Sequence, residues 1–353
     1  MLRFLGKRIR YSILVLLGVV TLVFFLFNVL PGDPARLTMG QRSDLQSLEN
    51  VRKEMNLDKP VATRYFLFLN DLSPIGIVGT DSAARAKYDF AKLIPLGNEK
   101  CIALKFPYLG RSYRTKREVG SVLMEALPGT VVLALAAMTI ATILGILLGT
   151  LAALKKDTWL DTSSIAASVA GISMPSFFAG LIIAYVFGFL LSKYTGLNMT
   201  GSLWEYDPFT GRHLVLKNMI LPAIALGIRP LAIITQLTRS ALLDVLSQDY
   251  IRTAYAKGLS QRQVVFRHAL PNALNPVVTA ISGWLAELLA GSFFIEYIFG
   301  WKGIGKLTVD ALDKFDFPMV MGSVLLTAFI FIIVNLVTDM LYGWLDPRVR
   351  LQR

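Results

Sequence analysis

The chain has 353 residues, of which 54% are hydrophobic and 17% are charged, and its formal net charge is +12. An apolar share this large excludes an ordinary soluble domain, which could not bury so much apolar surface. The single cysteine, Cys101, excludes an internal disulfide, and the two histidines, His213 and His268, form no metal-binding cluster in the sequence. The sequence therefore predicts no bound metal or other cofactor.

Apolar runs recur along the chain, and a membrane span needs ~20 predominantly apolar residues. Six runs meet this length: 9–30, 124–154, 163–192, 219–246, 273–299 and 319–345. The predicted fold class is thus an all-α polytopic membrane protein of about six transmembrane helices. The first run follows a cluster of cations, but no small-residue cleavage site comes after it. We therefore expect residues 1–30 to be a retained N-terminal transmembrane helix rather than a secretory signal.

Lys and Arg are unevenly distributed among the short connections. With the amino terminus inside, the short inside segments carry many more of these cations than the short outside loops. This predicts that both termini are cytoplasmic. The positive net charge is then mainly a topology signal, not a sign of nucleic-acid binding.

A long polar segment, residues 31–118, follows the first run and is expected to lie outside. It opens with Leu30-Pro31-Gly32-Asp33-Pro34, whose prolines and glycine break the helical pattern. Spaced apolar residues predict short helices near 45–57 and over 65–72. A connection of this length is usually functional or an elaboration of the fold.

Residues 119–346 are the predicted core of five transmembrane helices, followed by a cytoplasmic tail at 347–353. The runs 124–154 and 163–192 are joined only by residues 155–162, so we expect a tight antiparallel pair. Small residues recur in both runs and predict close helix packing: Ala134, Ala137, Ala141, Gly145, Gly149, Ala166, Ala170, Gly171 and Gly180. Prolines in or near the spans predict kinks that neighbouring helices must satisfy: Pro128, Pro175, Pro222 and Pro230.

The polar segment Asp249–Pro271, between the fourth and fifth runs, is predicted to be a helix, a break and a second helix. Three residues recur at the spacing of one helical face: Ile251, Tyr255 and Leu259. Gly258 suits a left-handed helix end, and Ser260 followed by Gln263 predicts a capping box that starts the second helix.

Three interpretations of this segment compete. It is a solvated basic loop that obeys the positive-inside rule, a nucleic-acid reader, or a docking element that carries force from a cytoplasmic partner to the bundle. Tethering to two membrane spans disfavours the nucleic-acid reader. The small residues of the first helix and the rigid join at Pro271 favour the docking element.

The same residues resemble a known family. Arg252-Thr253-Ala254, then Gly258, then His268-Ala269-Leu270-Pro271 keep the spacing of the cytoplasmic signature of binding-protein-dependent ABC importer permeases, although its leading acid and its isoleucine are replaced. The resemblance is nearest to the dipeptide/oligopeptide/nickel branch. Further stretches resemble that branch in the same order: Leu30–Ala35, Met55–Pro60, Leu109–Ser112, Leu127–Thr130, Ser173–Phe177 and Leu345–Arg348. Residues 73–105 have no recognised counterpart and are expected to be an insertion.

This resemblance implies a type I ABC importer permease bundle with a cytoplasmic coupling helix, in a bacterial inner membrane. It implies that Thr253, Ala254 and Gly258 contact an ATPase subunit, with His268, Leu270 and Pro271 bracing the contact. The implied partners are a homologous second permease, two ABC ATPase subunits and an extracytoplasmic solute-binding protein. The subunit itself would be non-catalytic and would carry peptides or a similar solute, with a nickel chelate as another candidate. The sequence does not select the solute, and a passive channel and a membrane-embedded enzyme remain alternatives from other classes.

Several polar residues in the apolar region need separate explanations. Gly300–Lys306 fits the first part of a P-loop, but Leu307 stands where Ser or Thr must bind magnesium, so we expect a glycine-rich outer loop instead. Charges inside spans are costly and are functional candidates: Arg229, Glu287 and Asp339. Arg229 and Glu287 are predicted to face the interior, either as a pair or along the translocation path. Glu296 resembles a glutamate of the family.

Overall fold

The computed structural model describes residues 2–28, 49, 52, 57–97, 99–209 and 211–345. The chain divides into two compact units, each presented here by itself. The first unit comprises Met1–Ile9, Ala126–Lys306 and Ile330–Arg353, and the second comprises Arg10–Glu125 and Leu307–Phe329. Several predicted features lie outside the described residues: the helix near 45–57, the stretches Leu30–Ala35 and Leu345–Arg348 for the most part, and the tail at 347–353.

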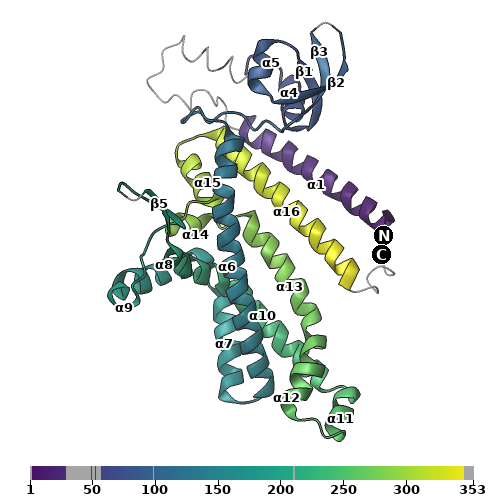
Figure 1. Ribbon diagram of the computed structural model, residues 1–353, viewed down its shortest axis with the longest axis vertical. Coiled ribbons are helices and arrows are strands. Elements are labelled where there is room, and N and C mark those ends of the chain that lie inside the picture. The colour runs from purple at the N-terminus through teal and green to yellow at the C-terminus, as the bar shows by residue number, and fades with distance from the viewer. Residues whose placement is uncertain are drawn as a thin grey trace. The chain divides into compact units, whose positions relative to one another are not determined.

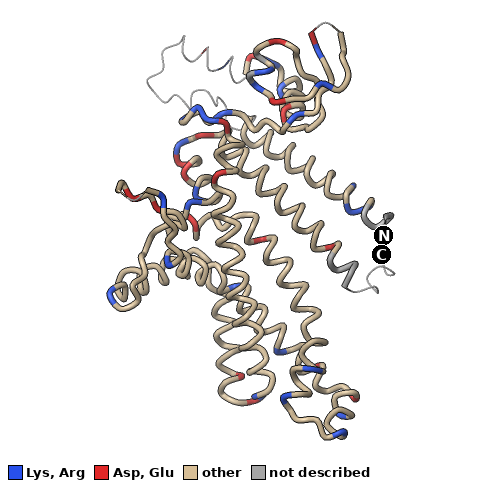
Figure 2. The backbone as a smooth tube through the Cα atoms, viewed as in Figure 1, with Lys and Arg blue, Asp and Glu red and all other residues tan. Residues whose placement is uncertain are grey.

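Within the described residues, four helices are long and apolar enough to cross a membrane, and two bent helix pairs raise the number of candidate spans to as many as six. The four are Gly6–Asn28, Val119–Leu154, Leu216–Leu246 and Phe317–Met340. This confirms a helical polytopic membrane protein. Figure 2 shows that these helices carry few charges along their lengths, as an apolar environment requires.

The first unit is built mainly from helices (Figure 1). Their bounds are α6 (Val119–Leu154), α7 (Trp159–Ser173), α8 (Ser176–Tyr185), α9 (Ser192–Thr195), α10 (Ile220–Leu246), α11 (Asp249–Ala256), α12 (Gln261–Gln263), α13 (Leu270–Ala290) and α14 (Phe293–Ile298). The π-helical turns η1 (Val186–Leu190) and η3 (Val264–Ala269) and the 3₁₀ turn η2 (Leu216–Met219) lie between them. A short hairpin of β4 (Trp204–Asp207) and β5 (Gly211–Leu214) precedes η2.

Close packing of α6 against α10 explains the small residues of α6. Ala134, Ala137 and Ala141 are at most 1% exposed. A Cβ at Gly149 would lie 2.5 Å from the carbonyl oxygen of Thr235, and a Cβ at Gly145 would lie 2.7 Å from Ile234. The predicted packing role of these residues is confirmed, because any larger side chain would force the two backbones apart.

Two predicted spans are not single helices. The run 163–192 is divided between α7 and α8, which are bent by 107° where Met174 and Pro175 interrupt the helix. The break lies at Pro175, one of the prolines at which a kink was predicted, and α7 is the part of this run that directly follows the turn after α6. The run 273–299 ends as a helix at Ala290, and Glu296 lies on the separate short helix α14.

The second unit contains most of α1 (Leu2–Asn28), the helix α4 (Val61–Leu72), and parts of α15 (Ile304–Asp313) and α16 (Phe317–Leu345). The predicted helix over 65–72 is confirmed as part of α4. Val20 and Val23 of α1 pack with Leu325 of α16 and with α4. In the stretch Leu109–Ser112, the buried Ser112 hydroxyl donates to Asp316 at 2.5 Å just before α16 begins.

The predicted insertion at 73–105 contains a small antiparallel sheet and a short helix. The strands are β1 (Ile75–Gly79), β2 (Phe90–Pro95) and β3 (Lys100–Lys105), in the order β1-β3-β2, and α5 (Ser82–Lys87) lies between β1 and β2 in sequence. Val78, Cys101 and Ala103 form its small core. The side-chain amide of Asn70 pairs with the backbone of Ile77 at 2.9 and 3.0 Å, which satisfies part of the β1 edge.

Candidate coupling site

Residues Asp249–Pro271 fold as a helix, a break and a second helical stretch. Helix α11 ends at Ala256, and Gly258 follows with φ +80°, the left-handed conformation that glycine adopts without strain. Ser260 then starts α12: its hydroxyl accepts from the Gln263 amide at 3.4 Å, and the Gln263 side chain accepts from the Ser260 amide at 3.0 Å. Both the glycine break and the capping box are confirmed.

One face of this segment is buried against the ends of two long helices. Ile251 and Ala254 of α11 pack in one cluster with Val264 of η3, Ala153 near the end of α6 and Leu242 near the end of α10. The segment is thus seated directly on the ends of α6 and α10.

The three residues that were predicted to share one helical face are not equally buried. Ile251 is 1% exposed and Leu259 is partly buried, whereas Tyr255 is 43% exposed. Ala254 is only 8% exposed and contacts this chain's own helices. Thr253 and Gly258 are the members of the predicted contact that lie exposed.

The exposed face of α11 and α12 is basic. Arg252, Lys257 and Arg262 are all exposed, and Figure 2 shows cations gathered at this end of the unit. His268 and Leu270 are partly buried, and Pro271 lies exposed in the first turn of α13. The segment therefore offers a rigid, positively charged surface on an apolar base.

A hydrogen bond fixes α11 to the start of α13. The Asn272 side-chain amide donates to the Tyr250 hydroxyl at 3.2 Å and to the His268 carbonyl at 2.8 Å. This link holds α11 against the start of α13. Asn272 was not among the residues that the sequence analysis named for this segment.

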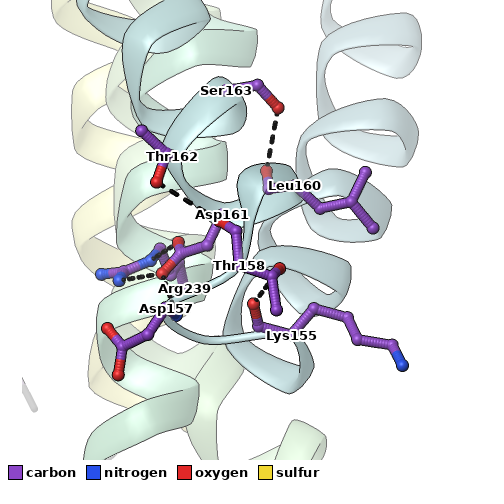
Figure 3. A network of polar contacts seen from close by, with 8 residues as sticks. All are labelled: Lys155, Asp157, Thr158, Leu160, Asp161, Thr162, Ser163 and Arg239. Atoms are coloured by element: carbon purple, nitrogen blue, oxygen red, sulfur yellow. Dashed lines mark hydrogen bonds and ion pairs between the residues drawn. The ribbon is translucent and has the colours of Figure 1, made fainter.

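A second contact that the sequence did not predict joins the α6–α7 turn to α10. Asp161 is 3% exposed, and its carboxylate accepts from Arg239 Nε at 2.5 Å and from Nη2 at 2.7 Å (Figure 3). The Asp157 amide also donates to Asp161, at 3.0 Å. A bidentate pair of this kind is geometrically specific, and it holds the start of α7 to α10. The spacing of residues could not predict this ion pair, because its two partners are 78 residues apart in the sequence.

The predicted path residues Arg229 and Glu287 do not form an ion pair with each other in the described part of the chain. The Arg229 guanidinium lies over the Trp284 ring, 5.6 Å from its centroid. Glu287 is exposed on α13, one helical turn after Trp284. Arg229 is also exposed, so both side chains are available to line a path or a subunit interface. That role stays a prediction.

Asp339 has a partner that accounts for its charge. Its carboxylate lies 2.9 Å from Arg8 at the start of α1. A charge in a membrane span is costly unless it is paired, so this contact favours a structural role for Asp339.

Glu296 is fully buried and is the centre of a polar network. Its carboxylate accepts from the Thr130 hydroxyl at 2.8 Å, the Ser292 hydroxyl at 3.2 Å and the Lys306 amide at 3.1 Å. The Ile304 amide donates in turn to the Thr130 hydroxyl at 2.9 Å. Burial raises the pKa of Glu296, and the hydrogen bonds from these donors oppose that rise.

The same network explains the P-loop-like stretch Gly300–Lys306. Its backbone amides bind an internal carboxylate where a P-loop would bind phosphate. The Trp301 indole donates to the Gly129 carbonyl at 2.9 Å, and a Cβ at Gly129 would lie 2.2 Å from the Lys302 carbonyl oxygen. The stretches Leu127–Thr130 and Gly300–Lys306 are thus contact partners, which their positions in the sequence do not reveal.

Among the described residues, no three His, Cys, Asp or Glu side chains come together as a metal site. The polar features of the bundle are instead ion pairs and hydrogen-bond networks between helices. These contacts hold the helices to one another.

Comparisons with known proteins agree with this arrangement. Residues 145–351 match the family described as "Binding-protein-dependent transport system inner membrane component", and residues 1–134 match its N-terminal counterpart, "Binding-prot-dependent transport system membrane comp, N-term". The di/tripeptide transport system permease protein DppB of Pseudomonas aeruginosa (strain UCBPP-PA14) is 38% identical over 368 aligned residues that cover 100% of each chain. The dipeptide transport system permease protein DppB of Haemophilus influenzae (strain ATCC 51907 / DSM 11121 / KW20 / Rd) is 38% identical over 364 residues, covering 99% of this chain and 100% of its own.

A solved inward-facing structure of the MetNI methionine ABC transporter aligns with a TM-score of 0.49 and 16% identity, covering 64% of this chain and 97% of that chain. The family match covers more than half of the sequence, and the full-length relatives are transport permeases. The prediction of a transport subunit rather than an enzyme is confirmed by these relatives. The chain therefore belongs to the family of inner membrane components of binding-protein-dependent transport systems.

Proposed function

We propose that this chain is the permease subunit of an ATP-driven importer of di- and tripeptides or slightly longer peptides, and that residues 249–271 couple it to ATPase subunits. The peptide substrate is proposed from the full-length relatives, which are di/tripeptide and dipeptide transport permeases. The coupling role is proposed from one observation above all: the exposed segment of α11 and α12, which carries Arg252, Lys257 and Arg262 against one acid, Asp249, sits on an apolar base formed by the ends of α6 and α10.

This geometry meets the mechanical requirements of a lever. Gly258 and the capping box at Ser260 hold α11 in a defined orientation, and the Asn272 link braces it against α13. Closure of the ATPases would displace α11 and, with it, α6 and α10. Rocking of these helices would open the path to one side of the membrane at a time.

We assign both termini to the cytoplasm and α11 to the cytoplasmic face, from the distribution of Lys and Arg among the short connections. We also propose that a second, homologous permease completes the path. Arg229 and Glu287, which lie exposed on α10 and α13 of this chain, would then face the shared path.

Site-directed cross-linking tests the coupling role. A cysteine at Thr253, which is exposed on α11, is expected to cross-link to a co-purified ATPase subunit, and the yield should change when a non-hydrolysable ATP analogue is added. Tyr194→Cys is the matched control: Tyr194 is 86% exposed on α9, on the face that we assign outside, and should give no such product. An active complex in which the Thr253 cysteine never reaches an ATPase would refute the coupling role.

A further inference from the structure

A cavity of about 860 Å³ lies within the second unit, where α1, α4, residues 108–116 and the start of α16 meet. Its volume is in the range of ~300–1,000 Å³ that is typical of clefts for small ligands. The candidate spans of α1 and α16 end at Asn28 and begin at Phe317. The cavity is therefore lined by the ends of two spans, at the depth where the hydrocarbon core of a bilayer meets the lipid headgroups.

The lining of this cavity has an apolar part and a cationic part. Apolar side chains come from the last turns of α1, from α4 and from the first turns of α16: Phe24, Leu67, Phe68, Met321 and Leu325. These residues adjoin the apolar cluster of the unit, so they offer a surface on which acyl chains can lie.

The charged part of the lining is strongly basic. It contains four cations, Arg64, Lys87, Arg111 and Lys116, and one acid, Asp71. Asp71 is already matched within the chain, because its carboxylate lies 2.9 Å from Lys87 and accepts from the Tyr88 hydroxyl.

The three remaining cations are only partly compensated. Arg111 lies 3.7 Å from Glu118, and both side chains are more than half exposed, so this pair is weak. No acid is paired with Arg64 or Lys116 within the described residues. An anion placed between these side chains would therefore be attracted by an excess of positive charge.

Arg64 has an unsatisfied donor in this lining. Its Nη2 donates to the Asn28 carbonyl, the C-terminal end of α1, at 2.7 Å. Its Nε is buried and has no hydrogen-bond partner among the described residues. Burial also lowers the pKa of the Arg64 guanidinium. A buried, unpaired donor is costly, and an anionic oxygen would remove that cost.

We propose that this cavity binds an anionic phospholipid of the surrounding bilayer. The phosphate lies among Arg64, Arg111 and Lys116, and the acyl chains lie on Leu67, Phe68 and Met321, apolar lining residues that are not fully buried. Planar guanidinium groups suit phosphate oxygens. A soluble phosphate would use the cationic part alone and would leave the apolar part empty, so the amphipathic lining favours a lipid.

Native mass spectrometry of the full transport complex tests this site. The complex is stripped of lipid and then titrated with phosphatidylglycerol, with phosphatidylethanolamine, or with glycerol 3-phosphate. We expect one phosphatidylglycerol to be retained per chain, with about tenfold preference over phosphatidylethanolamine because the anionic headgroup meets the uncompensated cations. Glycerol 3-phosphate should not compete at equal concentration.

Two variants locate the binding. Arg64→Gln and Lys116→Asn are each expected to weaken phosphatidylglycerol retention by about fivefold. Lys116 is exposed with φ +59°, a conformation that asparagine tolerates, so Lys116→Asn should fold even if Arg64→Gln loses the contact with α1. Lys92→Gln, an exposed change outside this cavity, is the control and should bind as the original chain does.

Several outcomes would overturn the proposal. Equal retention of the two phospholipids would show that charge does not select the ligand. Unchanged retention in Lys116→Asn and Arg64→Gln, or equal loss in Lys92→Gln, would place binding elsewhere. Displacement of the lipid by equimolar glycerol 3-phosphate would identify a soluble phosphate as the ligand.

Discussion

Asp161 and Arg239 are 78 residues apart in the sequence, yet they form a bidentate ion pair. Asp161 is almost fully buried, so the pair is the principal polar link between the α6–α7 turn and α10. Its position near the base of the coupling segment makes it a means of moving α7 together with α10.

Removing one partner of this pair should be costly. Arg239→Ala leaves the Asp161 carboxylate without its bidentate partner, so we expect a clearly lower thermal unfolding midpoint and a large loss of transport. Arg117→Ala removes an exposed cation paired with Glu125 and should cost less than ~1 kcal/mol. A similar midpoint for both variants would contradict a structural role for the Asp161–Arg239 pair.

The buried hydroxyl of Thr130 both donates to Glu296 and accepts from the Ile304 amide. Thr130→Val keeps the shape of the side chain but leaves the Ile304 amide without its bond, so we expect ~1–3 kcal/mol of destabilisation. Thr139→Val on the same helix is the control. Thr139 is exposed and bonds only to the Leu135 carbonyl within its own helix, so its loss should leave the melting midpoint nearly unchanged.

Glu287 tests the proposed path. Because it is exposed and has no ion-pair partner among the described residues, Glu287→Gln should not alter stability, but it should reduce peptide uptake several-fold if the carboxylate lines the path. Asp89→Asn, which neutralises an exposed acid before β2, should leave uptake intact. Normal uptake by Glu287→Gln would exclude the path role.

The conformation and hydrogen bonds of a single residue could be predicted from the sequence only where its near neighbours in the chain determine them. The capping box at Ser260 and the left-handed Gly258 follow from neighbours within a few positions. The Asp161–Arg239 pair and the bond between Thr130 and Glu296 depend on how helices that are distant in the sequence pack together. Neither the spacing of residues nor the composition reveals that packing. For the same reason, the family resemblance assigns Ala254 to a partner contact although the structure buries it within its own chain.

Among the elements, α11 and its glycine break are the most specific feature of the chain. Gly258 has φ +80°, and a Cβ added at this position would meet no other atom within 4 Å. Backbone strain alone would therefore penalise a side chain there. Gly258 thus contributes to the orientation of α11, together with the capping box at Ser260 and the Asn272 link.

Substitutions at Gly258 should rank by their tolerance of positive φ. Gly258→Ala is expected to cost ~1–2 kcal/mol locally and Gly258→Asn less, with transport per ATP hydrolysed falling in the same order. Gly283→Ala is the control, because Gly283 lies inside α13 with open space around it, and alanine should stabilise the helix slightly. Equal transport per ATP hydrolysed in all three variants would show that the glycine break plays no part in coupling.

Helix positions were more predictable than helix directions. Hydrophobic runs located the long helices because a span must be apolar over its whole length. The 107° bend between α7 and α8 was not predicted, although Pro175 predicts a kink of unspecified size. The amount of bending depends on the neighbours that satisfy the freed backbone groups, and these are set by tertiary packing.

For the whole molecule, the family match identifies a transport subunit. The proposed coupling role adds that force from separate ATPase subunits would be converted into helix movement. Polar networks that join the helices to one another would let them move together.

The most direct test is uptake of a labelled dipeptide by proteoliposomes that contain this chain, the proposed second permease, the ATPase subunits and the solute-binding protein. The account predicts accumulation against a gradient that requires ATP and the binding protein, and that is lost when Gly258 is replaced by valine while the ATPases still hydrolyse ATP. Dipeptide entry at the same rate without ATP, or down its gradient only, would contradict the account and favour a passive channel.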